Sequence, residues 1–133
     1  MLHLVNQYDL HNNITFLGVK INVPDYIQFC HIGIGGIAFN AVCQEFTINS
    51  KPQLLIDSSD NAGMPWKDGK NAIFIQPDKV YDLAEKLHWA AEHLDNIKII
   101  GNNAKQDMEP YIKSSKTGGA VYIKAFQELI RPF

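Results

Sequence analysis

The residues best suited to chemistry lie between Cys30 and Glu45, where a short apolar run, a group of glycines and a helical pattern follow one another. The stretch reads Cys-His-Ile-Gly-Ile-Gly-Gly-Ile-Ala-Phe-Asn-Ala-Val-Cys-Gln-Glu. A glycine-rich turn before a helix exposes backbone N–H groups at the positive end of the helix dipole, where a phosphate binds favourably. Glycine lets a diphosphate approach closely because it has no Cβ. We therefore expect an anion-binding turn, with a tight connection that binds no ligand as the alternative.

The same stretch also fits a loose dinucleotide-binding pattern. Gly33 and Gly35 are followed by Ala38 at the last place of the pattern. Asp57 lies about 20 residues further on, where an acid would bind a ribose hydroxyl. This second interpretation leaves Glu45 and the segment 64–78 without a role.

Glu45 lies beside the apolar stripe of its predicted helix and not within it. A helix carboxylate in such a position is ordinarily a solvated surface charge. Its place in the second turn, near the predicted strand ends, also allows it to accept hydrogen bonds from both hydroxyls of a ribose. From the residues alone, both interpretations stand.

These residues must be positioned by strands that alternate with helices. Four short apolar runs have strand composition: Ile14–Leu17, His31–Ile34, Gln53–Ile56 and Ala72–Ile75. Such alternation is typical of an α/β fold with a Rossmann-like parallel sheet flanked by helices. Ligands of open parallel sheets bind at the carboxyl ends of the strands, which is where the glycine turn and Asp57 are expected.

The predicted helices connect these strands. Apolar residues at helical spacing indicate a helix over 39–49 and a long helix that begins after an Asp78 cap. Residues 58–70 are rich in glycine, proline, aspartate and asparagine and are predicted to form a loop. Further helices are expected over 1–10, 24–29, 96–111 and 121–130, the last two separated by Gly118 and Gly119.

The chain has 133 residues and a formal net charge of −2, with 46% hydrophobic and 20% charged residues. This size and balance are typical of one globular domain and exclude a disordered or collagen-like chain. The lack of a basic excess argues against nucleic acid as a partner. The apolar runs are too short to span a membrane, and the first residues lack a signal-peptide pattern. Cys30 and Cys43 are expected to be reduced thiols of a cytoplasmic protein.

Two further features are weaker. Glu85 and His88 form half of a di-metal pattern whose other half is missing, so no metal site is expected. Trp66 follows Pro65 in the predicted loop, where it either packs the loop or borders a bound sugar.

Three segments, in order, resemble the C-terminal half of group 1 glycosyltransferases, the retaining family with a GT-B fold. They are Ile14-Thr-Phe-Leu-Gly18, Gln44-Glu-Phe-Thr-Ile-Asn-Ser-Lys-Pro52 and Asp68-Gly-Lys-Asn-Ala-Ile-Phe-Ile-Gln-Pro-Asp78. The first is similar to the family's Val-x-Phe-Leu-Gly strand. The second is similar to its Glu-led helix ending in Gly-Lys-Pro, and the third to its Asp-Gly-x-Asn-Gly turn. The resemblance covers residues 14 to about 105.

The resemblance implies that a nucleotide-diphosphate sugar binds at the glycine turn and that its sugar is transferred, with retention, to a hydroxyl acceptor. It implies no metal and no other cofactor. The family's helix glutamate falls on Glu45, which would hold the ribose hydroxyls. A second glutamate, eight positions earlier in many members, is replaced here by Ile37, and Ser50 replaces the usual glycine. The donor-binding residues so implied are Gly18, Gly35, Gly36, Ile37, Phe39, Asn40, Ala41 and Glu45.

The resemblance does not extend to the acceptor-binding N-terminal domain of the family. We therefore expect residues 1–133 to form a single, partial nucleotide-sugar-binding domain, with C-terminal helices over about 96–131. The expected partners are a nucleotide sugar and either a separate acceptor domain or a second copy, joined through exposed apolar surface. A non-catalytic remnant is the alternative. The expected location is the cytoplasm, free or peripheral to a membrane.

Overall fold

The computed structural model describes the fold of residues 2–35 and 40–129, with side chains described for 3–35, 40–59 and 61–113. Its centre is a parallel sheet of three strands in the order β1-β2-β3. These are β1 (Gly33–Ile34), β2 (Gln53–Ile56) and β3 (Ile73–Ile75). Ile34 pairs with Leu54, and Leu54 pairs with Ile73, so the strands run side by side in register.

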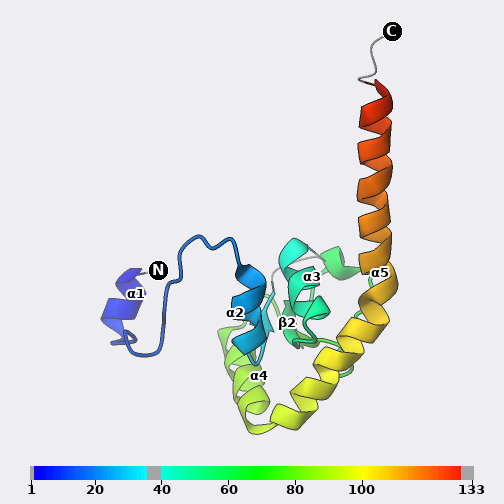
Figure 1. The fold of residues 1–133 in the computed structure, drawn as a ribbon. Coiled ribbons are helices and arrows are strands. Elements are labelled where there is room, and N and C mark those ends of the chain that lie inside the picture. The colour runs from blue at the N-terminus through cyan, green and yellow to red at the C-terminus, as the bar shows by residue number, and fades with distance from the viewer. Residues whose placement is uncertain (1, 36–39, 130–133) are drawn as a thin grey trace.

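The apolar runs become strands because both faces of the sheet are covered. Leu54 packs with residues of α4 (Val80–Glu92) on one face, and Leu55 packs with residues of α3 (Ala41–Ile48) on the other. Both leucines are fully buried, as expected for a parallel sheet between helices. The shorter α2 (Val23–Phe29) lies beside α3, and α1 (Leu2–Gln7) is set apart by an extended segment (Figure 1).

The last helix, α5 (Leu94–Leu129), joins the two apolar layers. Its Ile97 and Ile100 pack on the α4 side, whereas Ala104 and Met108 pack on the α3 side. Gly101 lies between them, at the amino end of the sheet. A Cβ on Gly101 would overlap the Ser50 carbonyl oxygen and lie 2.9 Å from the Pro52 nitrogen. Only glycine permits this approach.

Beyond the sheet, α5 changes direction and projects away from the domain (Figure 1). The helix contains Pro110, which lacks the N–H of a regular helical turn and bends helices. The predicted break at Gly118 and Gly119 is wrong, because α5 continues through both residues. A glycine in a helix costs only about 1 kcal/mol, which the rest of a long helix offsets.

The predicted strand Ile14–Leu17 is also wrong. Residues 14–22 lie between α1 and α2 outside any strand or helix, and the exposed fractions of Phe16 and Leu17 are 48% and 47%. The segment has β-branched and aromatic residues, but among the described residues no neighbouring strand pairs with it. Strand composition without a partner does not produce a strand.

The start of α4 differs from the prediction in one residue. The N-cap is Lys79 and not Asp78, whose backbone has a left-handed φ of 61°. Asp82 in the first turn instead accepts a hydrogen bond from the Gln76 amide at 2.7 Å. The remaining predicted strands and the loop before β3 are confirmed, with ends shifted by one or two residues and a short 3₁₀ turn at Ser59–Asn61.

Candidate functional site: the carboxyl end of the sheet

Because the strands are parallel, their carboxyl ends lie at one end of the sheet. β1 leads to Gly35, β2 to Asp57 and β3 to Gln76. The Asp57 amide donates to the Ile75 carbonyl at 2.8 Å, which places the ends of β2 and β3 together. We call this the carboxyl end of the sheet. It is the place where open α/β sheets bind ligands.

The N-terminus of α3 also lies at this end, since the helix follows β1 through a short connection. Its N-cap is Asn40, whose side-chain oxygen accepts the Cys43 amide at 3.0 Å. The first turn of α3 carries no acidic residue. The remaining first-turn amides have no partner within the helix, so this end is suited to an anion.

Two of the glycines that motivated the prediction serve packing. A Cβ on Gly33 would lie 2.7 Å from the Phe46 ring, and one on Gly35 would lie 2.6 Å from the Leu55 side chain. Gly33 therefore lets Phe46 of α3 pack closely on β1, whereas Gly35 makes room for Leu55 of β2 and for the Cys43 sulfur of α3, which a Cβ would approach to 3.3 Å. This close helix–strand packing is one of the roles that glycines have in nucleotide-binding turns.

Glu45 lies in the second turn of α3 and is partly exposed. Its backbone carbonyl accepts hydrogen bonds from the Asn49 amide and from the Asn49 side chain. Within the described part of the chain, no group is bonded to its carboxylate. The carboxylate is therefore available to a ligand, and its role stays a prediction.

The structure brings together only part of the predicted site. Gly35, Asn40, Ala41 and Glu45 lie between the end of β1 and the second turn of α3. Gly18 lies in the exposed segment before α2, with a φ of 65° and open space around its Cβ position. The remaining predicted residues, Gly36, Ile37 and Phe39, lie outside the described residues, as does Ala38 of the dinucleotide pattern.

Sequence reasoning missed two polar residues that follow β2. Asn61 donates to the Ile56 carbonyl at 2.9 Å, which folds residues 57–61 back onto the strand. The oxygen of the same side-chain amide is buried and has no hydrogen-bond partner, and neither has the buried Ser58 hydroxyl. Buried polar atoms without partners are uncommon and call for an explanation. The signal in the sequence is the polar run Asp57-Ser-Ser-Asp-Asn61 directly after a buried strand.

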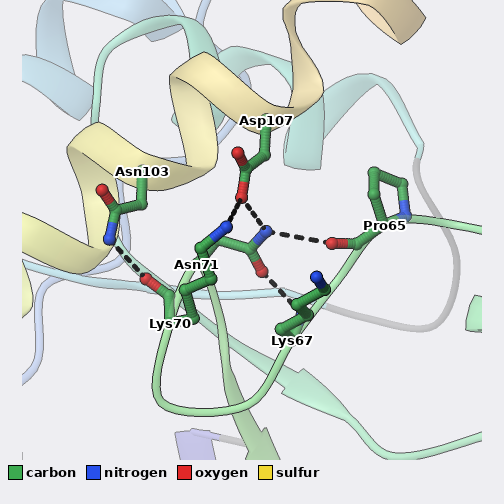
Figure 2. Close-up of polar contacts among 6 residues, drawn as sticks. All are labelled: Pro65, Lys67, Lys70, Asn71, Asn103 and Asp107. Atoms are coloured by element: carbon green, nitrogen blue, oxygen red, sulfur yellow. Dashed lines mark hydrogen bonds and ion pairs between the residues drawn. The ribbon is translucent and has the colours of Figure 1, made fainter.

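The loop between β2 and β3 is held from its far side by α5 (Figure 2). Asn71 is almost fully buried; its amide oxygen accepts the Lys67 amide at 2.6 Å and its NH₂ group donates to the Pro65 carbonyl at 3.0 Å. The same NH₂ group donates to Asp107 at 2.8 Å. The Lys70 ammonium also contacts Asp107 at 2.8 Å.

Asp107 therefore has an unusually favourable environment for its charge. The hydrogen bond from Lys70, followed by that from Asn71, lowers the pKa of its carboxyl group. Asn103 adds a further tie from α5 by donating to the Lys70 carbonyl at 3.0 Å. The network fixes residues 65–71, the part of the loop that leads into β3. Ser58 and Asn61 lie at the opposite end of the same loop, directly after β2.

Trp66 packs the loop, as one of its two interpretations expected. It is 8% exposed and lies in the apolar cluster with Cys43 and Leu55.

Glu85 and His88 are not part of a cluster that could bind a metal ion. Among the described residues, no three side chains of metal-ligating type come together. Cys30 and Cys43 are not joined in a disulfide. Cys43 is a core residue, and its burial raises the pKa of its thiol.

The chain was compared with known family models, curated proteins and solved structures. No known family model and no curated protein matches the sequence. Among solved structures, the chain is similar to Alr3699/HepE of Anabaena, determined in complex with UDP, with a TM-score of 0.76 and 18% sequence identity. The likeness covers 93% of this chain but 36% of HepE, about a third of its length.

The likeness shows the fold and confirms the expected class. The chain is an α/β domain with a Rossmann-like parallel sheet flanked by helices, similar to part of the HepE structure. None of the described helices combines the length and the apolar character needed to cross a membrane.

Proposed function

We propose that this chain is the donor-binding domain of a group 1-type glycosyltransferase, which binds a nucleotide-diphosphate sugar at the carboxyl end of the sheet. The observation that supports the proposal is the α3 N-terminus at this end, with Glu45 in the second turn of the same helix, in a fold similar to that of a UDP-bound protein. UDP is the group that leaves when a UDP-sugar donates its sugar, and its diphosphate suits a helix N-terminus.

In the proposed reaction, the bond between the anomeric carbon and the diphosphate oxygen breaks. A new bond forms to the acceptor hydroxyl oxygen on the same face, and the hydroxyl proton leaves with the diphosphate. Negative charge grows on the diphosphate as the old bond breaks. Backbone amides at Ala41 and Val42 would stabilise that charge, which is electrostatic catalysis without a metal ion or other cofactor.

The other polar groups would orient the donor. The Glu45 carboxylate would accept hydrogen bonds from the ribose hydroxyls. Ser58 and Asn61 carry the unpartnered polar atoms nearest in sequence to the carboxyl end of β2, and we assign them to the donor as well. The acceptor would bind to a second domain or a separate chain, so that the donor domain alone binds nucleotide but transfers no sugar. We place the enzyme in the cytoplasm, where its two cysteines stay reduced.

The proposal is tested by titrating the protein with UDP, GDP and a UDP-sugar in a calorimeter. We expect Glu45→Ala to weaken nucleotide-diphosphate binding about tenfold or more, which is about 1.4 kcal/mol. Glu92→Ala, a helix glutamate on α4, is the matched control and should bind as the parent does. If Glu45→Ala and Glu92→Ala bind equally well, Glu45 does not hold the ribose.

Asp57 supports a second candidate, a dinucleotide-binding module. β1 and β2 are adjacent and parallel, and Asp57 is exposed directly at the end of β2, as the ribose-binding acid of that pattern would be. Thermal protection by NAD, lost in Asp57→Asn and kept in Glu45→Ala, would favour this candidate. Thermal protection by UDP that is lost in Glu45→Ala and kept in Asp57→Asn would favour the donor-binding domain.

A further inference from the structure

The two outer strands of the sheet differ in how their free edges are protected. In β3, Ile75 faces β2, so the amides of Phe74 and Gln76 point outward. A carboxylate accepts each of them: Asp68 takes the Phe74 amide at 2.8 Å and Asp82 takes the Gln76 amide at 2.7 Å. Carboxylates at these positions prevent another strand from pairing with β3.

The edge of β1 has no such protection. Gly33 and Gly35 donate to the Pro52 and Leu54 carbonyls at 2.9 and 2.8 Å, so they face β2. The backbone of Ile34 therefore points away from the sheet, and no hydrogen bond to a described residue satisfies its amide. The Ile34 side chain is 58% exposed. An uncapped edge with an exposed apolar side chain is a site for strand addition.

An apolar groove lies beside this edge, on the α4 face. It has a volume of about 350 Å³, and its walls come from the two residues before β1, from α4 and from the start of α5. Its lining contains no lysine, arginine or carboxylate and consists of His31, Ile32, Leu87, Ala90, Ala91, Leu94 and Ile97. A strand added to β1 would place alternate side chains over this groove.

The same chain carries a segment that matches this edge. Residues 14–19 contain no charged residue, and their β-branched and aromatic side chains suit a strand. Phe16 is 48% exposed and Val19 is 98% exposed, which leaves their apolar surface in water. Neither the segment nor the groove would bury a charge if the two came together. Pairing is therefore favoured, because both surfaces are uncharged and because the segment and the β1 edge both have backbone groups that are not paired with another strand.

We propose that two copies of this chain form a dimer by reciprocal exchange, in which residues 14–19 of each copy pair as a strand with the β1 edge of the other. The second copy is the occupant because the chain before α2 runs away from its own sheet (Figure 1). In a two-fold dimer, each of the two segments pairs with one of the two β1 edges, so no unpaired edge is left to bind a third copy. The interface is distinct from the carboxyl end of the sheet and does not require nucleotide.

The first test is the mass of the protein in solution, measured by sedimentation over a range of concentrations. We expect a species of twice 15.0 kDa that dissociates on dilution. Ile34→Lys should raise the dissociation constant about tenfold or more, since a lysine at a strand edge opposes pairing. Ile99→Lys is the matched control: Ile99 has the same side chain and is 59% exposed, but it lies on α5 outside the groove.

The second test distinguishes reciprocal exchange from any other contact. Phe16→Lys changes the segment but leaves the edge intact, and Ile34→Lys does the opposite. At a concentration where the parent is a dimer, each variant alone should be mainly monomeric. A mixture of the two should form heterodimers, because one segment and one edge in each pair are unchanged.

Three results would overturn the proposal. One is a parent protein that stays monomeric at all concentrations, as it would if residues 14–19 paired within their own chain. Another is an equal effect of Ile34→Lys and Ile99→Lys on the dimer. The last is a mixture of Phe16→Lys and Ile34→Lys that stays monomeric while circular dichroism shows both variants folded.

Discussion

The amino end of the sheet is closed by α5, whereas the carboxyl end carries polar groups that nothing in the described structure satisfies. At the amino end, Gly101 packs against the chain before β2, and Asn71 and Asp107 bond the loop before β3 to the helix. At the carboxyl end, the carboxylates of Glu45 and Asp57 have no bonded partner among the described residues.

This difference indicates that the amino end of the sheet contributes to stability and the carboxyl end to ligand binding. Groups at the amino end are hydrogen-bonded to one another, so removing one should destabilise the fold. Groups at the carboxyl end have capacity left for a ligand, so changing one should alter binding with little effect on folding. Four substitutions test this separation, in decreasing order of their expected effect on stability.

The largest effect is expected for Gly101→Ala. The new Cβ would overlap the Ser50 carbonyl oxygen, which belongs to the backbone and cannot rotate away. We expect a loss of about 3 kcal/mol in the free energy of unfolding, at the upper end of overpacking costs. Urea denaturation measures this loss. Asn102→Ala, at the exposed neighbouring position, should not destabilise the protein; if both variants unfold at the same urea concentration, the close approach at Gly101 is not rigid.

Asn71→Ala should cost about 2 kcal/mol, because it leaves the Lys67 amide and the Pro65 carbonyl without partners in a partly buried place. Thermal unfolding followed by circular dichroism measures the change. Asn103→Ala, which removes one exposed bond to Lys70, should cost much less. Equal losses in the two variants would contradict the central place given to Asn71.

Asp107 should make stability depend on pH. Its pKa is lowered in the folded protein, so its charge contributes stability above the pKa of the unfolded chain, and this contribution is lost as the pH falls through the folded value. Since the side chain is 31% exposed, we expect less than about 1 kcal/mol.

The pH measurement compares the parent with Asp107→Asn, which keeps an acceptor for Asn71 but removes the charge. Their difference in unfolding free energy should be largest near neutral pH and should shrink below about pH 4, where aspartates become protonated. A difference that stays constant from neutral to acidic pH would show that the charge of Asp107 is not what matters.

The smallest effect on stability is expected for Asn40→Asp, which keeps the N-cap of α3 and adds a negative charge favoured by the helix dipole. Stability should change by less than about 1 kcal/mol. Nucleotide-diphosphate binding should weaken, because the added charge repels the phosphates. Asn40→Ser keeps an uncharged cap and should bind as the parent does. Unchanged UDP binding in Asn40→Asp, measured by calorimetry, would place the diphosphate elsewhere.

The strands that the sequence predicted correctly are those whose composition and surroundings agree. Gln53–Ile56 is a continuous apolar run, and the fold covers it on both faces. Ile14–Leu17 has equally good composition, but pairing depends on a distant neighbour that composition does not reveal. The same limit applies to the candidate site: Asn40 and Glu45 were predicted from a local helical pattern, whereas Ser58 and Asn61 were noticed only through their unpartnered atoms in the structure.

The sequence by itself determined the α/β class, the order of the buried strands and the helix that carries Glu45, because these follow from local periodicity and composition. Only the tertiary structure decided that Gly33, Gly35 and Gly101 serve close packing, that α5 closes the amino end of the sheet, and that β1 has an open edge. Each of these depends on contacts between segments far apart in the chain. Such contacts are set by how the elements fit together in space, which no local pattern of residues specifies.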